Sequence, residues 1–264
     1  MSTDSTRKTI LVALAVCLVC SVLVSTAAVG LKGIQNKNKE LDKLKNILSA
    51  GNIGTDDADI RRVFAEKIEA DIVELSTGKI ISKDQYNALL NPDVFDIKRI
   101  AKDPQYSRKI SPSADIAQIK QMPKYMAIYR VIEKGEIQKV ILPIYGKGLW
   151  STMYGFIALD KDLTTVKGFT FYDHGETPGL GGEVDNPRWK QSWIDKKLFD
   201  ENGQLKIEVI KDKVDREKPD AQYQVDGLSG ATITTRGVDA LVRFWLSESG
   251  YGPYIERMRT GEQG

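Results

Sequence analysis

The chain has 264 residues, of which 41% are hydrophobic, so it can bury a core and does not have the composition of a disordered protein. Its 38 basic and 36 acidic residues nearly balance, and no dense block of lysine and arginine points to a nucleic-acid partner. The only cysteines, Cys17 and Cys20, lie in the most apolar stretch, which excludes a disulfide framework or a cysteine-based metal site in the rest of the chain.

The N-terminal segment from Ile10 to Leu31 carries no charge and is about long enough to cross a bilayer as a helix. We therefore expect residues 1–33 to form a transmembrane anchor. A cleaved signal peptide is the alternative, because Arg7 and Lys8 precede the apolar run and small residues end it. Lysines are more numerous after the span than before it, and basic residues usually mark the cytoplasmic side of a membrane span. Because this positive-inside rule weakens when a large domain follows the span, the charges leave the orientation undecided.

Residues 34–123 open with a helical stalk that should stop at Gly51, a typical C-terminal signal. A second helix is predicted to start at Thr55 with Asp56 and Asp57 in its first turn. The mixed polar stretch from Ala70 to Gln121 gives no clear elements. The apolar residues at helical spacing are Ile34, Leu41, Leu44, Ile47 and Leu48 in the stalk, and Ile60, Val63, Phe64 and Ile68 in the second helix.

Residues 124–264 have the pattern of an α+β domain. Four segments rich in β-branched and aromatic residues, 125–132, 137–145, 151–160 and 165–174, are separated by polar turns and predict an antiparallel meander. A helix should follow Asn186-Pro187, then two strands at 205–210 and 222–227, and finally an amphipathic helix from Thr234 to Ser247. The fold class is therefore an antiparallel sheet with flanking helices, preceded by one N-terminal transmembrane helix.

Two glycine-rich loops are the strongest candidates for a ligand site: residues 174–182, and residues 226–232 just before the last helix. Glycine allows close approach of a backbone to a ligand, and the start of a helix favours an anion such as phosphate. The second loop lacks the spacing of a Walker loop or a dinucleotide fingerprint. The alternative is a simple tight turn in which Thr232 or Thr234 caps the helix.

The segments Glu176–Val184 and Asp226–Thr234, in that order before an amphipathic helix, resemble the covalent FMN-binding domain family of bacterial respiratory complexes. Within that family the chain is most similar to the NqrC subunits of Na⁺-translocating NADH:quinone reductases. The likeness also covers the N-terminal span, the stalk, residues 146–156 and the closing segment 244–259.

This resemblance implies one FMN per chain, joined through its phosphate to Thr232 by a dedicated flavin transferase that uses FAD. It also implies a set of further cofactor-binding residues. Glu176 could instead cap backbone N–H groups of its own loop, and Lys211 could be a solvated surface charge. The implied neighbours of the flavin are Trp150, Glu176, Thr177, Gly179, Leu180, Gly181, Lys211, Ser229, Gly230 and Ala231.

The resemblance further implies an electron-transfer subunit that relays electrons between NADH and quinone in a complex coupled to Na⁺ export. The other subunits, the flavin transferase and membrane lipid would be its partners, and it would be a single-pass inner-membrane protein with a periplasmic domain. The alternatives are the homologous flavoprotein of a ferredoxin:NAD oxidoreductase complex, or a membrane-tethered ligand-binding or scaffold domain.

No catalytic residue and no metal site are expected in the chain itself. His174 is the sole histidine, which disfavours a hydrolytic triad and a structural metal site. No nicotinamide-binding fingerprint is present either, so we do not expect the chain to oxidise NADH alone.

Overall fold

The computed structural model describes residues 5–54 and 59–261. The chain divides into two compact units, Met1–Lys43 and Leu44–Gly264. The first contains most of helix α1 (Thr6–Ala50). The part of α1 from Thr6 to Gln35 is long and apolar enough to cross a membrane, and none of its most apolar stretch is buried. This confirms the predicted N-terminal apolar helix, and the predicted stalk continues it as far as Ala50.

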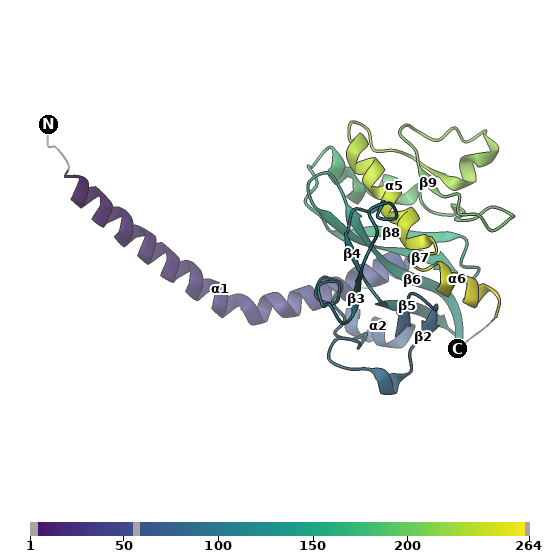
Figure 1. The fold of residues 1–264 in the computed structure, drawn as a ribbon, viewed down its shortest axis with the longest axis horizontal. Coiled ribbons are helices and arrows are strands. Elements are labelled where there is room, and N and C mark those ends of the chain that lie inside the picture. The colour runs from purple at the N-terminus through teal and green to yellow at the C-terminus, as the bar shows by residue number, and fades with distance from the viewer. Residues whose placement is uncertain (1–4, 55–58, 262–264) are drawn as a thin grey trace. The chain divides into compact units, whose positions relative to one another are not determined.

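The second unit is built on a six-stranded sheet in the order β2-β1-β5-β6-β7-β8, in which every neighbouring pair is antiparallel (Figure 1). The meander predicted from the segments rich in β-branched and aromatic residues corresponds to its last four strands. The six strands are β1 (Ile68–Glu74), β2 (Lys79–Ile80), β5 (Tyr125–Glu133), β6 (Glu136–Lys147), β7 (Thr152–Asp160) and β8 (Val166–Asp173).

Shorter elements surround the sheet. The predicted strands near residues 205–210 and 222–227 are present as the two-residue strands β9 and β10, which pair with each other in parallel. The remaining elements are α2 (Ile60–Lys67), η2 (Lys83–Gln85), α3 (Ile97–Ile100), β3 (Ser107–Lys109), β4 (Gln121–Pro123), η3 (Gly181–Asp185), α4 (Pro187–Gln191), β9 (Glu208–Val209), η4 (Pro219–Tyr223), β10 (Gln224–Val225), α5 (Thr232–Leu246) and α6 (Gly252–Arg259).

The second helix differs from its prediction. Its expected start at residues 55–57 lies outside the described residues, and its described part is α2, Ile60–Lys67. Ile68, assigned to the helix from its apolar spacing, is instead the first residue of β1, where it pairs with Val131. Pairing with β5 along the whole of β1 outweighs the helical spacing, because local propensity is a weak determinant beside tertiary contacts.

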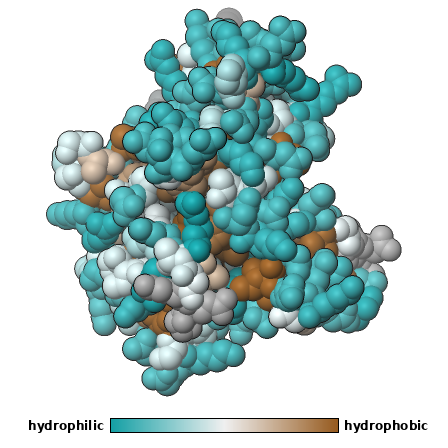
Figure 2. Space-filling view, turned by 90° about the vertical axis from the view of Figure 1, so that its right-hand side faces the viewer, coloured by the Kyte–Doolittle hydropathy of each residue, from teal (hydrophilic) through white to brown (hydrophobic). Residues whose placement is uncertain are grey.

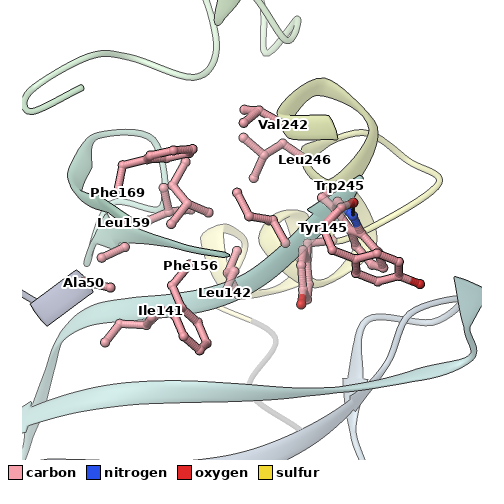
Figure 3. Packing of buried hydrophobic residues seen from close by; sticks show 14 of the residues in the cluster. Ala50, Ile141, Leu142, Tyr145, Phe156, Leu159, Phe169, Val242, Trp245 and Leu246 are labelled. Atoms are coloured by element: carbon pink, nitrogen blue, oxygen red, sulfur yellow. Dashed lines mark hydrogen bonds between the residues drawn. The ribbon is translucent and has the colours of Figure 1, made fainter. Parts of the chain in front are cut away.

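One hydrophobic core joins the end of α1, the sheet and α5. Ala50 is 1% exposed, and Val242, Trp245 and Leu246 of α5 are no more exposed than that (Figure 3). The Trp245 indole N–H donates a hydrogen bond of 2.6 Å to the backbone oxygen of Tyr145, so the polar edge of this buried ring is satisfied. Hydrophilic residues cover most of the face drawn in Figure 2, and apolar residues show only in places between them.

The last turn of α1 packs directly on the sheet. A Cβ atom added to Gly168 in β8 would lie 1.8 Å from the backbone oxygen of Ala50, so only glycine permits this close approach. On β6, the Lys139 ammonium donates to the backbone oxygen of Gly51 at 2.6 Å. The end of α1 is therefore part of the globular unit.

We predict that Gly168→Ala destabilises the globular unit by about 3 kcal/mol, the upper end of the range for overpacking, because backbone atoms of α1 must move. Gly54→Ala is the matched control, since a Cβ at Gly54 would meet nothing within 4 Å. Thermal unfolding of the full chain in detergent, followed by near-ultraviolet circular dichroism, measures both. Equal melting temperatures for the two variants would contradict the close packing of α1 on β8.

Candidate functional site

The carboxylate of Glu176 connects three segments that are distant in the sequence. It is 6% exposed, and it accepts a hydrogen bond of 2.6 Å from the Thr234 hydroxyl in the first turn of α5. The backbone N–H groups of the loop after β6 also donate to it, from Leu149 at 3.2 Å, from Trp150 at 2.9 Å and from Ser151 at 3.4 Å. Glu176 thus caps the loop at residues 149–151. The alternative in which it caps N–H groups of its own loop is wrong.

These donors decide the charge state of Glu176. Burial raises the pKa of the Glu176 carboxyl, but the hydrogen bonds from the Thr234 hydroxyl and the three backbone N–H groups outweigh burial and hold the pKa below its ordinary value. Glu176 is therefore ionised at neutral pH. Charge-assisted hydrogen bonds of this kind are stronger than those between neutral groups. The carboxylate therefore holds the loop at residues 149–151 and its own loop, residues 174–182, firmly against α5.

Glycines let the three segments approach Glu176. A Cβ at Gly148 would lie 2.6 Å from Oε1 of Glu176, and a Cβ at Gly181 would lie 2.5 Å from the Thr234 hydroxyl oxygen. Any side chain at either position would displace the carboxylate or its donor. Gly148 and Gly181 therefore allow the loop after β6 and the 174–182 loop to pack around the Glu176 carboxylate.

Three threonines at the start of α5 differ in what their hydroxyls do. Thr234 and Thr235 are 1% and 2% exposed, and both hydroxyls are hydrogen-bonded: Thr234 to Glu176, and Thr235 to the backbone oxygen of Ala231 at 3.0 Å. Thr232 is half-buried, and within the described part of the chain its hydroxyl makes no hydrogen bond. Thr232 thus carries the hydroxyl of this group that is available for chemistry.

The start of α5 also differs from the expected cap. The N-cap residue is Ala231, which provides no side-chain hydrogen bond, and Thr232 is the first residue of the helix. The interpretation of Thr232 or Thr234 as a helix cap is therefore wrong, and the helix starts two residues before its predicted start. The N–H of Leu228 is instead satisfied by the Thr235 hydroxyl at 3.0 Å, which closes the loop onto the helix.

Several apolar side chains at the start of α5, and in the two loops that Glu176 joins to it, are exposed. Leu180 adjoins the loop before Thr232, since a Cβ at Gly230 would lie 3.3 Å from its side chain. Such exposed apolar side chains suit a planar aromatic group better than they suit water. The exposed fractions are 40% for Leu149, 66% for Trp150, 46% for Leu180 and 57% for Ile233.

The other residues singled out from the sequence lie in the same two loops or beside them. Thr177 and Gly179 are exposed, and the backbone oxygen of Thr177 accepts from the N–H groups of Leu180 and Gly182, which shapes the turn. Ser229 and Gly230 are exposed and Ala231 is buried. The Lys211 backbone lies against Gly227, where a Cβ would be 2.3 Å from its oxygen, and its exposed side chain makes no hydrogen bond or ion pair with the described residues.

Two further residues support the loops and were not predicted to do so. The Glu176 N–H donates to Nδ1 of His174 at 3.2 Å, so Nε2 carries the proton and donates to Asp185 at 2.8 Å. Asp226 accepts from the Val214 N–H through its side chain at 2.7 Å and from the Trp189 indole N–H through its backbone at 2.8 Å. The local sequence does not predict these contacts. Asp185 lies 11 residues from His174, and Trp189 lies 37 residues from Asp226. Which ring nitrogen of His174 carries the proton also depends on the fold.

Comparisons with known proteins place this site within one family model. The FMN-binding domain model matches residues 148–247, which include both glycine-rich loops. The NqrC subunit of the Na⁺-translocating NADH-quinone reductase of Pseudomonas aeruginosa is 45% identical over 262 residues, 98% of each chain. The corresponding subunit of Yersinia pestis is also 45% identical, over 98% of this chain and 95% of its own.

Solved structures of the same type of subunit also match the chain. The crystal structure of Shewanella oneidensis NqrC matches with a TM-score of 0.75 at 33% identity, over 84% of this chain and 99% of that one. The crystal structure of the same subunit of the Na⁺-translocating NADH-quinone reductase from Parabacteroides distasonis matches with a TM-score of 0.65 at 27% identity, over 85% and 96% of the two chains.

We predict that Glu176→Gln destabilises the globular unit by about 1.5–3 kcal/mol, the range for hydrogen bonds to charged groups, because the amide N–H₂ would face N–H donors. Glu201→Gln, at an exposed turn, makes the same change of charge and is the control. Urea unfolding of the full chain in detergent, followed by tryptophan fluorescence, measures both variants. A cost for Glu176→Gln no larger than that for Glu201→Gln would show that the carboxylate does not hold the loops.

The lowered pKa of Glu176 has a defined effect on the dependence of stability on pH. Because the folded-state pKa lies below the unfolded value of about 4.3, the stabilisation is fully present above about pH 4.3 and is lost as the pH falls through the folded-state pKa. The difference in unfolding free energy between the native chain and Glu176→Gln should therefore shrink between about pH 5 and pH 3. A difference that stays constant over this range would contradict the pKa assignment.

Proposed function

The chain belongs to the NqrC family of Na⁺-translocating NADH-quinone reductase subunits, and from this membership we propose that it carries FMN on Thr232 and relays electrons within such a membrane complex. In this proposal the electron transfer is coupled to Na⁺ export by the complex as a whole. The near-complete coverage of relatives of this one subunit type favours this function over a ferredoxin:NAD oxidoreductase or a redox-inactive scaffold.

The observation that carries the proposal is that Thr232 is half-buried and its hydroxyl makes no hydrogen bond with the described residues, whereas the hydroxyls of the buried Thr234 and Thr235 are both engaged. Flavin transfer from FAD would form a bond between Thr232 Oγ and the phosphorus next to riboflavin, and would break the bond between the two phosphates. AMP would leave, and the hydroxyl proton would pass to solvent or to a base of the flavin transferase. A hydroxyl that donates to a buried carboxylate, as that of Thr234 does, would first have to break that bond.

The residues around Thr232 fit the group. A phosphodiester at the start of α5 would be stabilised by the helix dipole by about 0.3–1 kcal/mol. The exposed side chains of Trp150, Leu180 and Ile233 offer an apolar surface to the isoalloxazine ring, and Glu176 keeps the loops that carry Trp150 and Leu180 against α5. When bound, FMN supplies the one- and two-electron redox chemistry.

In the same proposal, residues 1–33 would anchor the chain in the inner membrane in contact with lipid, and residues 124–264 would carry the flavin. Residues 34–123 would connect these two parts, and from Leu44 onward they belong to the same compact unit as residues 124–264. The soluble part would lie in the periplasm, where the flavin transferase modifies it, and the other subunits of the complex would exchange electrons with it. The apolar N-terminal helix supports the anchor.

We predict that Thr232→Ala abolishes covalent flavin while the domain remains folded, because the Thr232 hydroxyl makes no hydrogen bond with the described residues. Thr234→Ala should keep the flavin but lower the stability by about 1.5–3 kcal/mol, since it removes a donor to the Glu176 carboxylate. Intact-mass spectrometry of chains produced with and without the flavin transferase reads the attachment. Peptide mapping that finds the phosphoester on Thr234 or Thr235 would contradict the site.

We predict a periplasmic position for the globular unit. After Cys17 and Cys20 are replaced by alanine, a single cysteine at Asn202, in an exposed turn, should react with a membrane-impermeant maleimide in intact cells with a permeable outer membrane. A cysteine at Ser5, before the span, should react only after lysis. The reverse pattern would place the domain in the cytoplasm, as the larger number of lysines after the span suggests.

A further inference from the structure

Arg236 lies four residues after Thr232 in α5, which places it one turn further along the same face of the helix. Residues at this spacing have Cβ atoms about 5–6 Å apart. Long side chains in a helix also lean toward its N-terminus, so a guanidinium at position 236 is within reach of the turn that contains Thr232. Arg236 is exposed, as expected for a position on the face opposite the buried Val238 and Leu241.

Within the described part of the chain, Arg236 makes no ion pair or hydrogen bond. Two carboxylates close to Arg236 or Thr232 in the sequence or the fold already have partners. Glu176 accepts from four donors, and Asp239, three residues after Arg236, accepts from the Val209 N–H at 2.8 Å and pairs with Arg243 at 3.9 Å. Arg236 therefore pairs with no counter-charge among the described residues.

We propose that Arg236 is the counter-ion of the phosphodiester that joins FMN to Thr232, an inference that rests on the attachment proposed above. A phosphodiester keeps one negative charge and two unesterified oxygens, and a guanidinium matches such a pair of oxygens with two parallel N–H donors. The pairing neutralises the charge that flavin attachment adds to the helix. It also fixes the phosphate, and with it the direction in which the riboflavin leaves α5.

The inference distinguishes Arg236 from the other basic residues of the region. Arg243 lies on the same exposed face, but it is 11 residues from Thr232, about 16 Å along the helix axis, and it already pairs with Asp239. The backbone of Lys211 lies against Gly227, five residues before Thr232, and its ammonium would offer a point charge without the fork geometry. Arg236 combines the spacing, the direction and the donor geometry.

A thermodynamic cycle tests the pairing. The full chain and its Arg236→Gln, Arg236→Lys and Arg243→Gln variants are each produced with and without the flavin transferase, and their melting temperatures are measured in detergent. The increase in melting temperature on flavin attachment should be smaller in Arg236→Gln by about 2–4 °C, intermediate in Arg236→Lys, and unchanged in Arg243→Gln. The difference between native and Arg236→Gln should disappear at about 1 M salt, because an exposed pair is screened.

A second readout is independent of stability. The ³¹P resonance of the phosphodiester should shift between the native chain and Arg236→Gln, and should not shift in Arg243→Gln. Equal flavin-dependent melting increases and equal ³¹P resonances in both glutamine variants would overturn the role of Arg236. Loss of flavin from Arg236→Gln alone, with an unmodified form that melts like the native unmodified chain, would support it.

The outcome also separates this inference from the one on which it rests. A native chain that gains no flavin mass in the presence of the transferase contradicts the attachment itself. A native chain that gains the flavin, with no coupling to Arg236, contradicts only the counter-ion.

Discussion

The buried carboxylate of Glu176 is the contact on which the site depends. It joins residues 58 positions apart, Glu176 and Thr234, and it also caps the loop that carries Trp150. Leaving a carboxylate buried without donors would cost several kcal/mol, and here four donors offset that cost. Because the same group binds all three segments, displacing any one of them leaves the charge undersatisfied, which makes the arrangement cooperative.

The geometry of one helix turn then decides which hydroxyl remains available. Successive residues of α5 are separated by about 100° around its axis, so Thr234 and Thr235 point into the core when Val238, Leu241 and Val242 do. Thr232 falls at the edge of the exposed face, next to Arg236. The difference between the three hydroxyls of the Thr-Ile-Thr-Thr run is therefore a consequence of the amphipathic pattern of α5.

That pattern could be predicted from the sequence, whereas the contacts of Glu176 could not. A long uncharged run predicted the apolar N-terminal helix, β-branched and aromatic residues predicted the meander, and apolar spacing predicted the buried face of α5. Each of these signals is carried by residues that are close together in the sequence. The assignment of Ile68 to a helix was wrong since its partner Val131 is distant in sequence, and strand β1 went unrecognised for the same reason. The hydrogen bond of Trp245 to Tyr145 spans 100 residues and leaves no local trace.

The resemblance to flavin-binding domains pointed to Glu176 and Thr232, but the reason that Glu176 matters is visible only in three dimensions.

In the proposed role, a half-buried attachment point on a rigid support would meet two requirements that conflict in a buried site. A transferase would have to reach the hydroxyl of a folded chain, and the other redox centres of a complex would later have to come close to the attached ring. Hydroxyls as buried as those of Thr234 and Thr235 would be reached only after α5 separates from the loops, which means breaking the Glu176 contacts. Thr232 stands on the first turn of a helix whose opposite face is locked into the core by Trp245 and its neighbours, so it combines access with a fixed position. Trp150, Leu180 and Ile233 remain in contact with water in this arrangement, and an aromatic group bound over them would gain from burying their apolar surface.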